Sequence, residues 1–233
     1  MILVIKNGIY DTDIINIIKY IDNSLKIDMI QSDKITKKLC YDIMMKYDSI
    51  IILGGFQSLT NRHTIEYPYK YLNELIEFTK IWIQNNIYIL GICLGAQIIG
   101  ETLGCKTLPM GYTISGYQKN IKLNIFDDNI IKNNIPIMMD YFISNHNDYI
   151  DIRNKNIDII ASLEIKNNMN VPYIFRYKNI YGLQFHPEIT LNILKKSSVA
   201  FNMDIINFAN NNIDIIQYAT YTLFKNWLDI INK

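Results

Sequence analysis

The stretch Tyr88-Ile89-Leu90-Gly91-Ile92-Cys93-Leu94-Gly95-Ala96-Gln97 decides the fold. The apolar run 87–90 predicts a short buried strand, and residues 96–103 predict a helix directly after it. A nucleophile at the apex of such a turn forms an elbow, in which glycines leave room for tight backbone packing. The turn would lift the sulfur of Cys93 out of the sheet, and the helix N-terminus behind it would favour the thiolate. This motif by itself is explained equally well by a small, unreactive cysteine packed in a tight turn. The rest of the chain must therefore decide between a reactive and a packed cysteine.

The residues before the elbow alternate between predicted strands and helices. Strands are expected at 2–5, 27–30 and 49–53, and helices at 13–21, 35–47 and 69–84. This alternation is typical of a parallel α/β sheet, in which ligands bind beyond the carboxyl ends of the strands. Gly54-Gly55 stands at such an end and can present a backbone N–H to a developing oxyanion. By itself it indicates an ordinary glycine turn, but its place on the strand before the elbow favours the functional interpretation.

The second half of the chain is richer in strands. Residues 109–116 contain glycines and a proline and predict a loop. Strands are expected at 120–125, 137–143, 157–162, 172–177 and 180–185, with the polar cluster 144–148 at the end of one of them. Helices are expected at 190–195 and 214–231, while residues 196–212 show no clear pattern. The short connections predict antiparallel pairing, so we expect a mostly parallel central sheet with a small antiparallel extension.

The last predicted strand runs into Gln184-Phe185-His186-Pro187-Glu188. His186 and Glu188 lie two residues apart and therefore on one side of an extended segment. The intervening proline restricts His186 to an extended backbone, which preserves this geometry. A histidine in a loop beside a solvated glutamate is the simpler explanation, but the cysteine elbow earlier in the chain makes it the poorer one.

The amino-acid composition limits the number of domains, the class of partner and the compartment. The 233 residues are 49% apolar, which suits one large α/β domain spanning 1–233, although two small domains are possible. With 23 basic and 22 acidic residues, bulk charge gives no support for a nucleic-acid partner. No apolar stretch is long enough for a signal peptide or membrane span. Three cysteines predict no disulfide framework and fit a reducing cytoplasm, with Cys40 and Cys105 as packed thiols.

Gly54-Gly55, the block 91–97 and the block 184–188 occur in this order and together resemble the class I (triad-type) glutamine amidotransferases. The resemblance covers roughly residues 45–190. It looks closest to the glutaminase domain of GMP synthase and to free-standing GMP-synthase-like amidotransferases. It implies a flavodoxin-like three-layer sandwich with helices on both faces of the sheet, and neither a cofactor nor a metal.

The resemblance also implies a role for individual residues. Cys93 would be the nucleophile, His186 its base and later the acid for departing ammonia, and Glu188 the group that orients His186. The backbone N–H groups of Gly55 and Leu94 would form an oxyanion hole. His146 would orient its loop, and Phe56 replaces a proline found in many relatives. The residues implied to bind glutamine are Gln57, Gln97, Asn145, Asn147 and Asp148.

The activity implied is hydrolysis of L-glutamine to glutamate and ammonia through a cysteine thioester. The ammonia would pass to a synthetase on another chain or domain, because no Gly-rich phosphate loop follows a strand here. One alternative is a free-standing γ-glutamyl peptidase or hydrolase, which uses the same residues with water as final acceptor. Another is a non-catalytic partner-binding module of the same fold, against which an intact triad argues.

Overall fold

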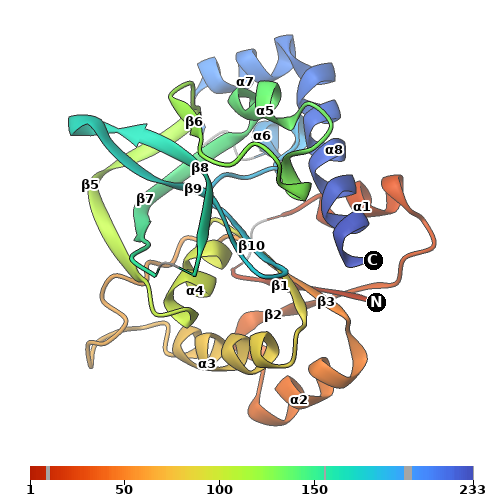
Figure 1. Cartoon of the computed structure of the whole chain (residues 1–233), viewed down its shortest axis with the longest axis vertical. Coiled ribbons are helices and arrows are strands. Elements are labelled where there is room, and N and C mark those ends of the chain that lie inside the picture. The colour runs from red at the N-terminus through yellow and green to blue at the C-terminus, as the bar shows by residue number, and fades with distance from the viewer. Residues whose placement is uncertain (9–10, 155, 197–200, 233) are drawn as a thin grey trace.

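A computed structural model describes residues 1–8, 11–154, 156–196 and 201–232. Its centre is a sheet with strand order β2-β1-β3-β4-β10-β9-β8-β6 (Figure 1). Neighbouring strands run parallel through β2 (Ile27–Gln31), β1 (Ile2–Lys6), β3 (Ser49–Ile52), β4 (Tyr88–Ile92) and β10 (Ile180–Leu183). The sheet continues antiparallel through β9 (Met169–Tyr177), β8 (Asp158–Ile165) and β6 (Ile121–Leu123). The predicted parallel sheet with an antiparallel extension is confirmed, and its parallel half has the flavodoxin-like order.

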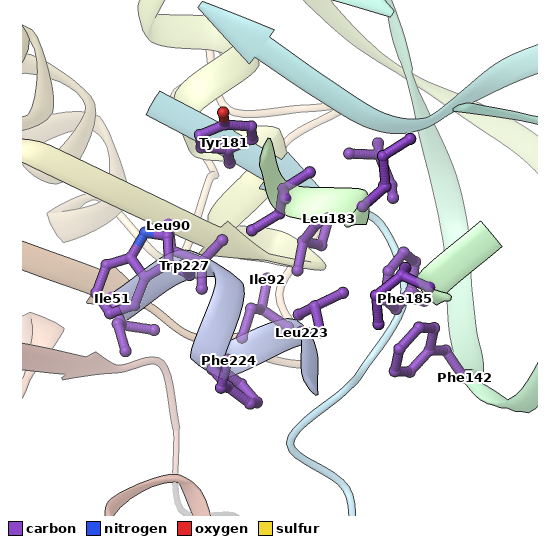
Figure 2. Close-up of a cluster of buried hydrophobic side chains, with 14 of the residues drawn as sticks. Ile51, Leu90, Ile92, Phe142, Tyr181, Leu183, Phe185, Leu223, Phe224 and Trp227 are labelled. Carbon is purple, nitrogen blue, oxygen red and sulfur yellow. The ribbon is translucent and has the colours of Figure 1, made fainter. Parts of the chain in front are cut away.

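Helices cover both faces of this sheet because each buried strand alternates its side chains between two apolar layers. In β1, Ile2 and Val4 pack into one core with α1 (Ile14–Ile21) and α8 (Ile213–Ile231). Leu3 and Ile5 pack into the other core with α2 (Lys37–Lys46), α3 (Tyr71–Gln84) and α4 (Leu94–Thr102). Figure 2 shows the first core, where Leu223, Phe224 and Trp227 of α8 meet strand residues such as Leu90 and Ile92.

Two predicted elements are wrong. Residues 109–116 belong to a strand, β5 (Lys106–Tyr117), and are not a loop. Its glycines are accommodated because Gly111 and Gly116 adopt positive φ, and the register shifts between Pro109 and Ile114, as in a β-bulge. Residues 137–141 form no strand but parts of α5 (Ile135–Met138) and the 3₁₀ turn η3 (Met139–Tyr141), because Pro136 starts a helical turn, and only Ile143 of the predicted strand is extended, as the start of the next strand.

These corrections change how the polar cluster 144–148 is presented. It lies inside β7 (Ile143–Asp151), which pairs with β5 in a separate two-stranded sheet. The first residue of β7, Ile143, forms an isolated antiparallel bridge with His186, whose backbone N–H donates to the Ile143 carbonyl at 2.8 Å. The small sheet is thereby fastened to the segment that follows β10.

The C-terminal part continues with α6 (Leu191–Lys196) and α7 (Met203–Asn211). The region 196–212, in which no clear pattern is visible from sequence, thus contains a helix, while residues 197–200 lie outside the described part. Leu194, Phe201 and Ile206 form a third apolar cluster with Ile143 of β7. Within the described ranges, no helix is both long enough and apolar enough to cross a membrane.

Candidate active site

A cleft of about 340 Å³ opens at the carboxyl ends of β1, β3, β4 and β10. This is the edge at which open parallel sheets bind ligands, and the volume is within the range of small-molecule sites. Cys93, His186 and Glu188 all line it, together with Gly54 and Gly55. The structure therefore brings into one cavity residues that are far apart in the sequence.

Cys93 stands at the apex of the strand-to-helix turn between β4 and α4. Its φ is +52°, an uncommon value for a residue with a side chain. The neighbouring glycines are required by close backbone approach. A Cβ on Gly95 would lie 1.9 Å from the Ile52 carbonyl oxygen, and one on Gly91 would lie 2.5 Å from the Gly95 oxygen. Strain of this kind at a nucleophile, held by surrounding packing, is the geometry of an elbow.

Gly54 has a different role from the one its sequence position indicates. A Cβ at Gly54 would lie 2.8 Å from Cε1 of His186 and 3.3 Å from Cβ of Cys93. The missing side chain thus leaves the space in which the imidazole ring lies beside the cysteine. The first glycine of the pair leaves room for the histidine ring, and the second is the candidate for an N–H group that contacts the substrate.

His186 is joined to Glu188 as the sequence spacing predicts. Its Nδ1 donates to Glu188 Oε1 at 2.8 Å, and both side chains are nearly buried. Burial by itself lowers the pKa of His186, but the charges of Glu188 and Cys93 and hydrogen bonds to both raise it well above its ordinary value. The ring is thus able to take a proton and hold it beside the sulfur.

Gly55 and Leu94 lie where two backbone N–H groups can face the cleft. Leu94 is the first residue of α4, and the first N–H groups of a helix have no partner within it. Gly55 is crowded by Asn7, whose carbonyl oxygen would lie 2.7 Å from an added Cβ. The buried Asn7 side chain also donates to the Leu53 carbonyl at 2.8 Å, which holds the end of β3 in place.

The predicted glutamine-binding residues separate into two groups. Asn145, Asn147, Gln57 and Gln97 line the cleft. Asp148 does not line it: the buried carboxylate accepts a hydrogen bond from Ser58 at 2.6 Å and ties β7 to the loop after β3. Asn145 and Asn147 are also more exposed than the neighbours between and after them, as the alternation of a strand predicts.

His146 is buried and lines the cleft next to Asn145. Its Nδ1 donates to the Asp148 carbonyl at 2.9 Å, so Nε2 carries a lone pair and has no hydrogen-bond partner in the described protein. Burial lowers the pKa of His146 to about 4, despite the bond to Asp148. A neutral His146 keeps the backbone of β7 in place without adding a second positive charge beside His186.

Sequence reasoning missed part of the cleft. Lys6 ends β1, and Asn7, Asp11 and Thr12 follow it. Thr113 comes from β5, and a further wall consists of Ile189, Ile193 and Phe201. The rule that ligands bind at the carboxyl ends of parallel strands could have found the residues after β1. No local signal marks Thr113, whose hydroxyl donates to Asn147 Oδ1 at 2.6 Å, because the glycines and proline around it are typical of a loop.

The other two cysteines differ from Cys93 in their surroundings. Cys40 and Cys105 are buried, unpaired thiols, and burial raises the pKa of each to about 11. They are therefore poor nucleophiles at neutral pH. This matches the prediction of packed core thiols and leaves Cys93 as the cysteine that lies in the cleft.

Comparison with known proteins agrees with the fold. Solved structures of glutamine amidotransferases from Thermotoga maritima (TM-score 0.68, 16% identity) and Methylobacillus flagellatus (TM-score 0.70, 8% identity) share the fold. The first alignment covers 100% of this chain and 98% of the other, and the second covers 99% and 94%. The chain therefore has the α/β fold of these amidotransferases.

Sequence similarity identifies the family. The family "Glutamine amidotransferase class-I" matches residues 4–204, and the chain belongs to it. The glutamine amidotransferase-like protein L716 of Acanthamoeba polyphaga mimivirus is 33% identical over 231 residues, which cover 94% of each chain. A glutamine-hydrolysing GMP synthase subunit from Sulfolobus acidocaldarius is 29% identical, over 78% of this chain and 85% of that one. The match to the Aquifex aeolicus GMP synthase, 32% identical, spans only 21% of that longer protein and 48% of this chain.

Proposed function

We propose that residues 1–233 act as one glutaminase domain that releases ammonia from L-glutamine through a thioester on Cys93. The observation that carries this proposal is the seating of the His186 ring over Gly54, next to Cys93, with Glu188 on its far nitrogen. A histidine held between a thiol and a carboxylate is the arrangement that activates a cysteine nucleophile. Family membership supports the same reaction.

In the first half of the reaction the sulfur of Cys93 attacks the γ-carbonyl carbon of glutamine. His186 takes the thiol proton, and Glu188 stabilises the resulting imidazolium. The carbonyl oxygen becomes an oxyanion that the N–H groups of Gly55 and Leu94 stabilise. The C–N bond then breaks, His186 gives its proton to the leaving nitrogen, and ammonia departs from a thioester.

In the second half, water attacks the thioester through the same oxyanion site and releases glutamate. His186 takes a proton from the water and returns one to the sulfur. Losing one donor of such a hole typically costs roughly 100- to 1000-fold in rate, so the positions of Gly55 and Leu94 carry much of the expected acceleration. Asn7 supports this site indirectly by holding the end of β3.

The amino-acid end of glutamine is zwitterionic and needs neutral polar groups that can both donate and accept. Gln97, Asn145 and Asn147 line the cleft and supply such groups. Asp148 supports this wall from behind through Ser58. This division of roles makes the asparagines contact residues and the aspartate a positioning residue.

The ammonia acceptor in this proposal is a synthetase, either on a separate chain or in a further domain. One relative is named as a subunit of GMP synthase, and that name describes one part of a larger enzyme. The test is ammonia release from glutamine by the isolated chain and then with candidate synthetase chains added. Turnover that disappears in Cys93→Ser supports the proposal. Absence of ammonia with every candidate synthetase present would count against the proposal and leave the γ-glutamyl hydrolase and the non-catalytic binding module as the remaining explanations.

A further inference from the structure

His186 and Glu188 lie on the segment 184–190, which joins β10 to α6. The described residues of this segment form neither a helix nor a strand, so its shape depends on contacts with other elements. At its start, the N–H of His186 donates to the carbonyl of Ile143. At its end, the Thr190 hydroxyl donates to the carboxylate of Asp13. The proline between the histidine and the glutamate is held by a third contact.

This third contact comes from α8. The hydroxyl of Thr220 donates to the carbonyl oxygen of Pro187 at 3.1 Å, and the Thr220 side chain is buried. Proline has no N–H, so this carbonyl is its one backbone hydrogen-bonding group. The carbonyl belongs to the planar peptide unit that joins Pro187 to Glu188, so the hydrogen bond fixes the orientation of that unit.

The Thr220 bond differs from those of other helical threonines in this protein. A threonine hydroxyl in a helix can donate to the carbonyl four residues earlier. Thr79 of α3 does so to Leu75 at 2.7 Å, and Thr102 of α4 does so to Ile98 at 2.8 Å. Thr220 instead donates to another element, and it thereby couples α8 to the segment that carries the histidine and the glutamate.

The donor has a fixed position because α8 is deeply packed. Ala219 and Leu223, which flank Thr220 along the helix, are fully buried in the first apolar core. That core also contains Phe185, the residue before His186, which Figure 2 shows together with Leu223. Close-packed interiors resist small displacements, so the hydroxyl and the segment cannot separate without disturbing the core.

The orientation of Glu188 depends on its backbone. Its Oε1 accepts the hydrogen bond from His186, but its buried Oε2 has no hydrogen-bond partner in the part of the chain that the structure describes. The other groups that act on the His186 ring lie on separate elements, with Cys93 at the elbow and His146 on β7. The direction of the carboxylate is therefore set by its bond to the imidazole and by the peptide that Thr220 fixes.

We propose that Thr220 is a positioning residue: through the Pro187 carbonyl it holds the Glu188 carboxylate in line with the imidazole. The inference rests on the proposed roles of His186 and Glu188 in activating Cys93. The family match ends at residue 204, so α8 provides this support from a part of the chain beyond that match.

The test compares the native chain with Thr220→Val, which keeps the shape of the side chain and removes the donor. We expect kcat for ammonia release to fall about tenfold with KM changed by less than about twofold, since a misplacement of about 1 Å can cost about 100-fold in rate. Thr220→Ser restores a hydroxyl and should recover most of the rate. Thr222→Val is the matched control, because this buried threonine lies roughly 200° further round α8 and should leave kcat unchanged.

A second measurement separates positioning from a general loss of stability. The dependence on pH of the rate at which iodoacetamide alkylates Cys93 should shift in Thr220→Val in the same direction as in Glu188→Gln. Both substitutions act through the same carboxylate, so adding Thr220→Val to Glu188→Gln should slow alkylation by less than about twofold. Urea unfolding confirms that each variant is folded in the assay, and Thr220→Ala replaces Thr220→Val if that variant does not fold.

The outcomes separate this inference from the proposed function. A Thr220→Val chain with native kcat and a native alkylation profile would overturn the inference. A further loss of about tenfold in the Glu188→Gln background would also overturn it, because Thr220 would then act by another route. Alkylation needs no glutamine, so it decides the role of Thr220 even where the absence of ammonia has refuted the glutaminase.

Discussion

Replacing Gly54 with alanine should reduce activity while leaving the fold stable. The added Cβ would meet Cε1 of His186 at 2.8 Å, about 0.6 Å inside the 3.4 Å at which ordinary contact begins, and the Cβ of Cys93 at 3.3 Å. The Gly54 backbone is not in the positive-φ region, so alanine adds no backbone strain. His186 must therefore shift by roughly half an ångström or more. Since a misplacement of about 1 Å can cost about 100-fold in rate, we expect kcat/KM for glutamine to fall roughly 10- to 100-fold.

The assay is ammonia release, accompanied by the rate at which iodoacetamide alkylates Cys93. Both should fall together, because both depend on the contact between His186 and the sulfur. Urea unfolding should still be cooperative, with a free energy of unfolding lowered by at most about 1–3 kcal/mol, because the added Cβ overpacks the contact with His186. Gly104→Asn is the control: it lies in open space with φ +83°, which asparagine tolerates, and should not affect either rate. A Gly54→Ala enzyme within twofold of the native rate would refute the seating of His186 by Gly54.

Three further predictions concern charge. Glu188→Gln should lower the pKa of His186, because the charge of Glu188 raises it. The substitution should also reduce kcat roughly 100-fold or more and slow the alkylation of Cys93 at pH 7. A dependence of kcat on pH that is unchanged from pH 5 to 9 would contradict this. The unfolded chain protonates His146 near pH 6.5 and the folded chain only near pH 4, so this group's contribution to stability is present above pH 6.5 and is lost as the pH falls toward 4. Urea unfolding at pH 7 and pH 5 should show a drop about 2 kcal/mol larger in the native chain than in His146→Gln, and equal drops would exclude the assignment. Asp128→Asn should lower the free energy of unfolding by about 2 kcal/mol, because the Asp128 carboxylate is buried and accepts a hydrogen bond from Arg176 at 2.5 Å. Asp158 also pairs with Arg176, but its side chain is 47% exposed, so Asp158→Asn should cost under about 1 kcal/mol in the same urea titration.

The order of strands and helices up to α4 could be predicted because it depends on local patterns. Short apolar runs such as 49–53 and 87–90 become buried strands, and amphipathic runs such as 13–21 become helices, whatever their partners. The elbow is equally local, since its glycines and cysteine lie within a few residues. The pairing of His186 with Glu188 follows from the period of an extended segment.

What could not be predicted depends on contacts between distant residues. β5 contains Gly111 and Gly116 and looks like a loop until its pairing with β7 is known. Without that pairing the start of β7 has no local marker, so the sequence could not assign Asp148 to the face that bonds Ser58. The role of Gly54 in seating His186 and the wall formed by Lys6 and Phe201 likewise exist only when separate elements meet at the end of the sheet.

The last helix has a consequence for how the chain is made. α8 supplies Leu223, Phe224 and Trp227 to the same apolar core that contains Cys93, and it packs against α1. At typical rates of translation, roughly 5–20 residues per second, the ribosome needs roughly 7 to 28 seconds to pass from Cys93 to Ile231. Throughout that interval β3 and β4 lack the part of their cover that α8 supplies. The apolar core around Cys93 is therefore completed only when translation has passed α8, so the last helix sets when the cysteine acquires its folded surroundings.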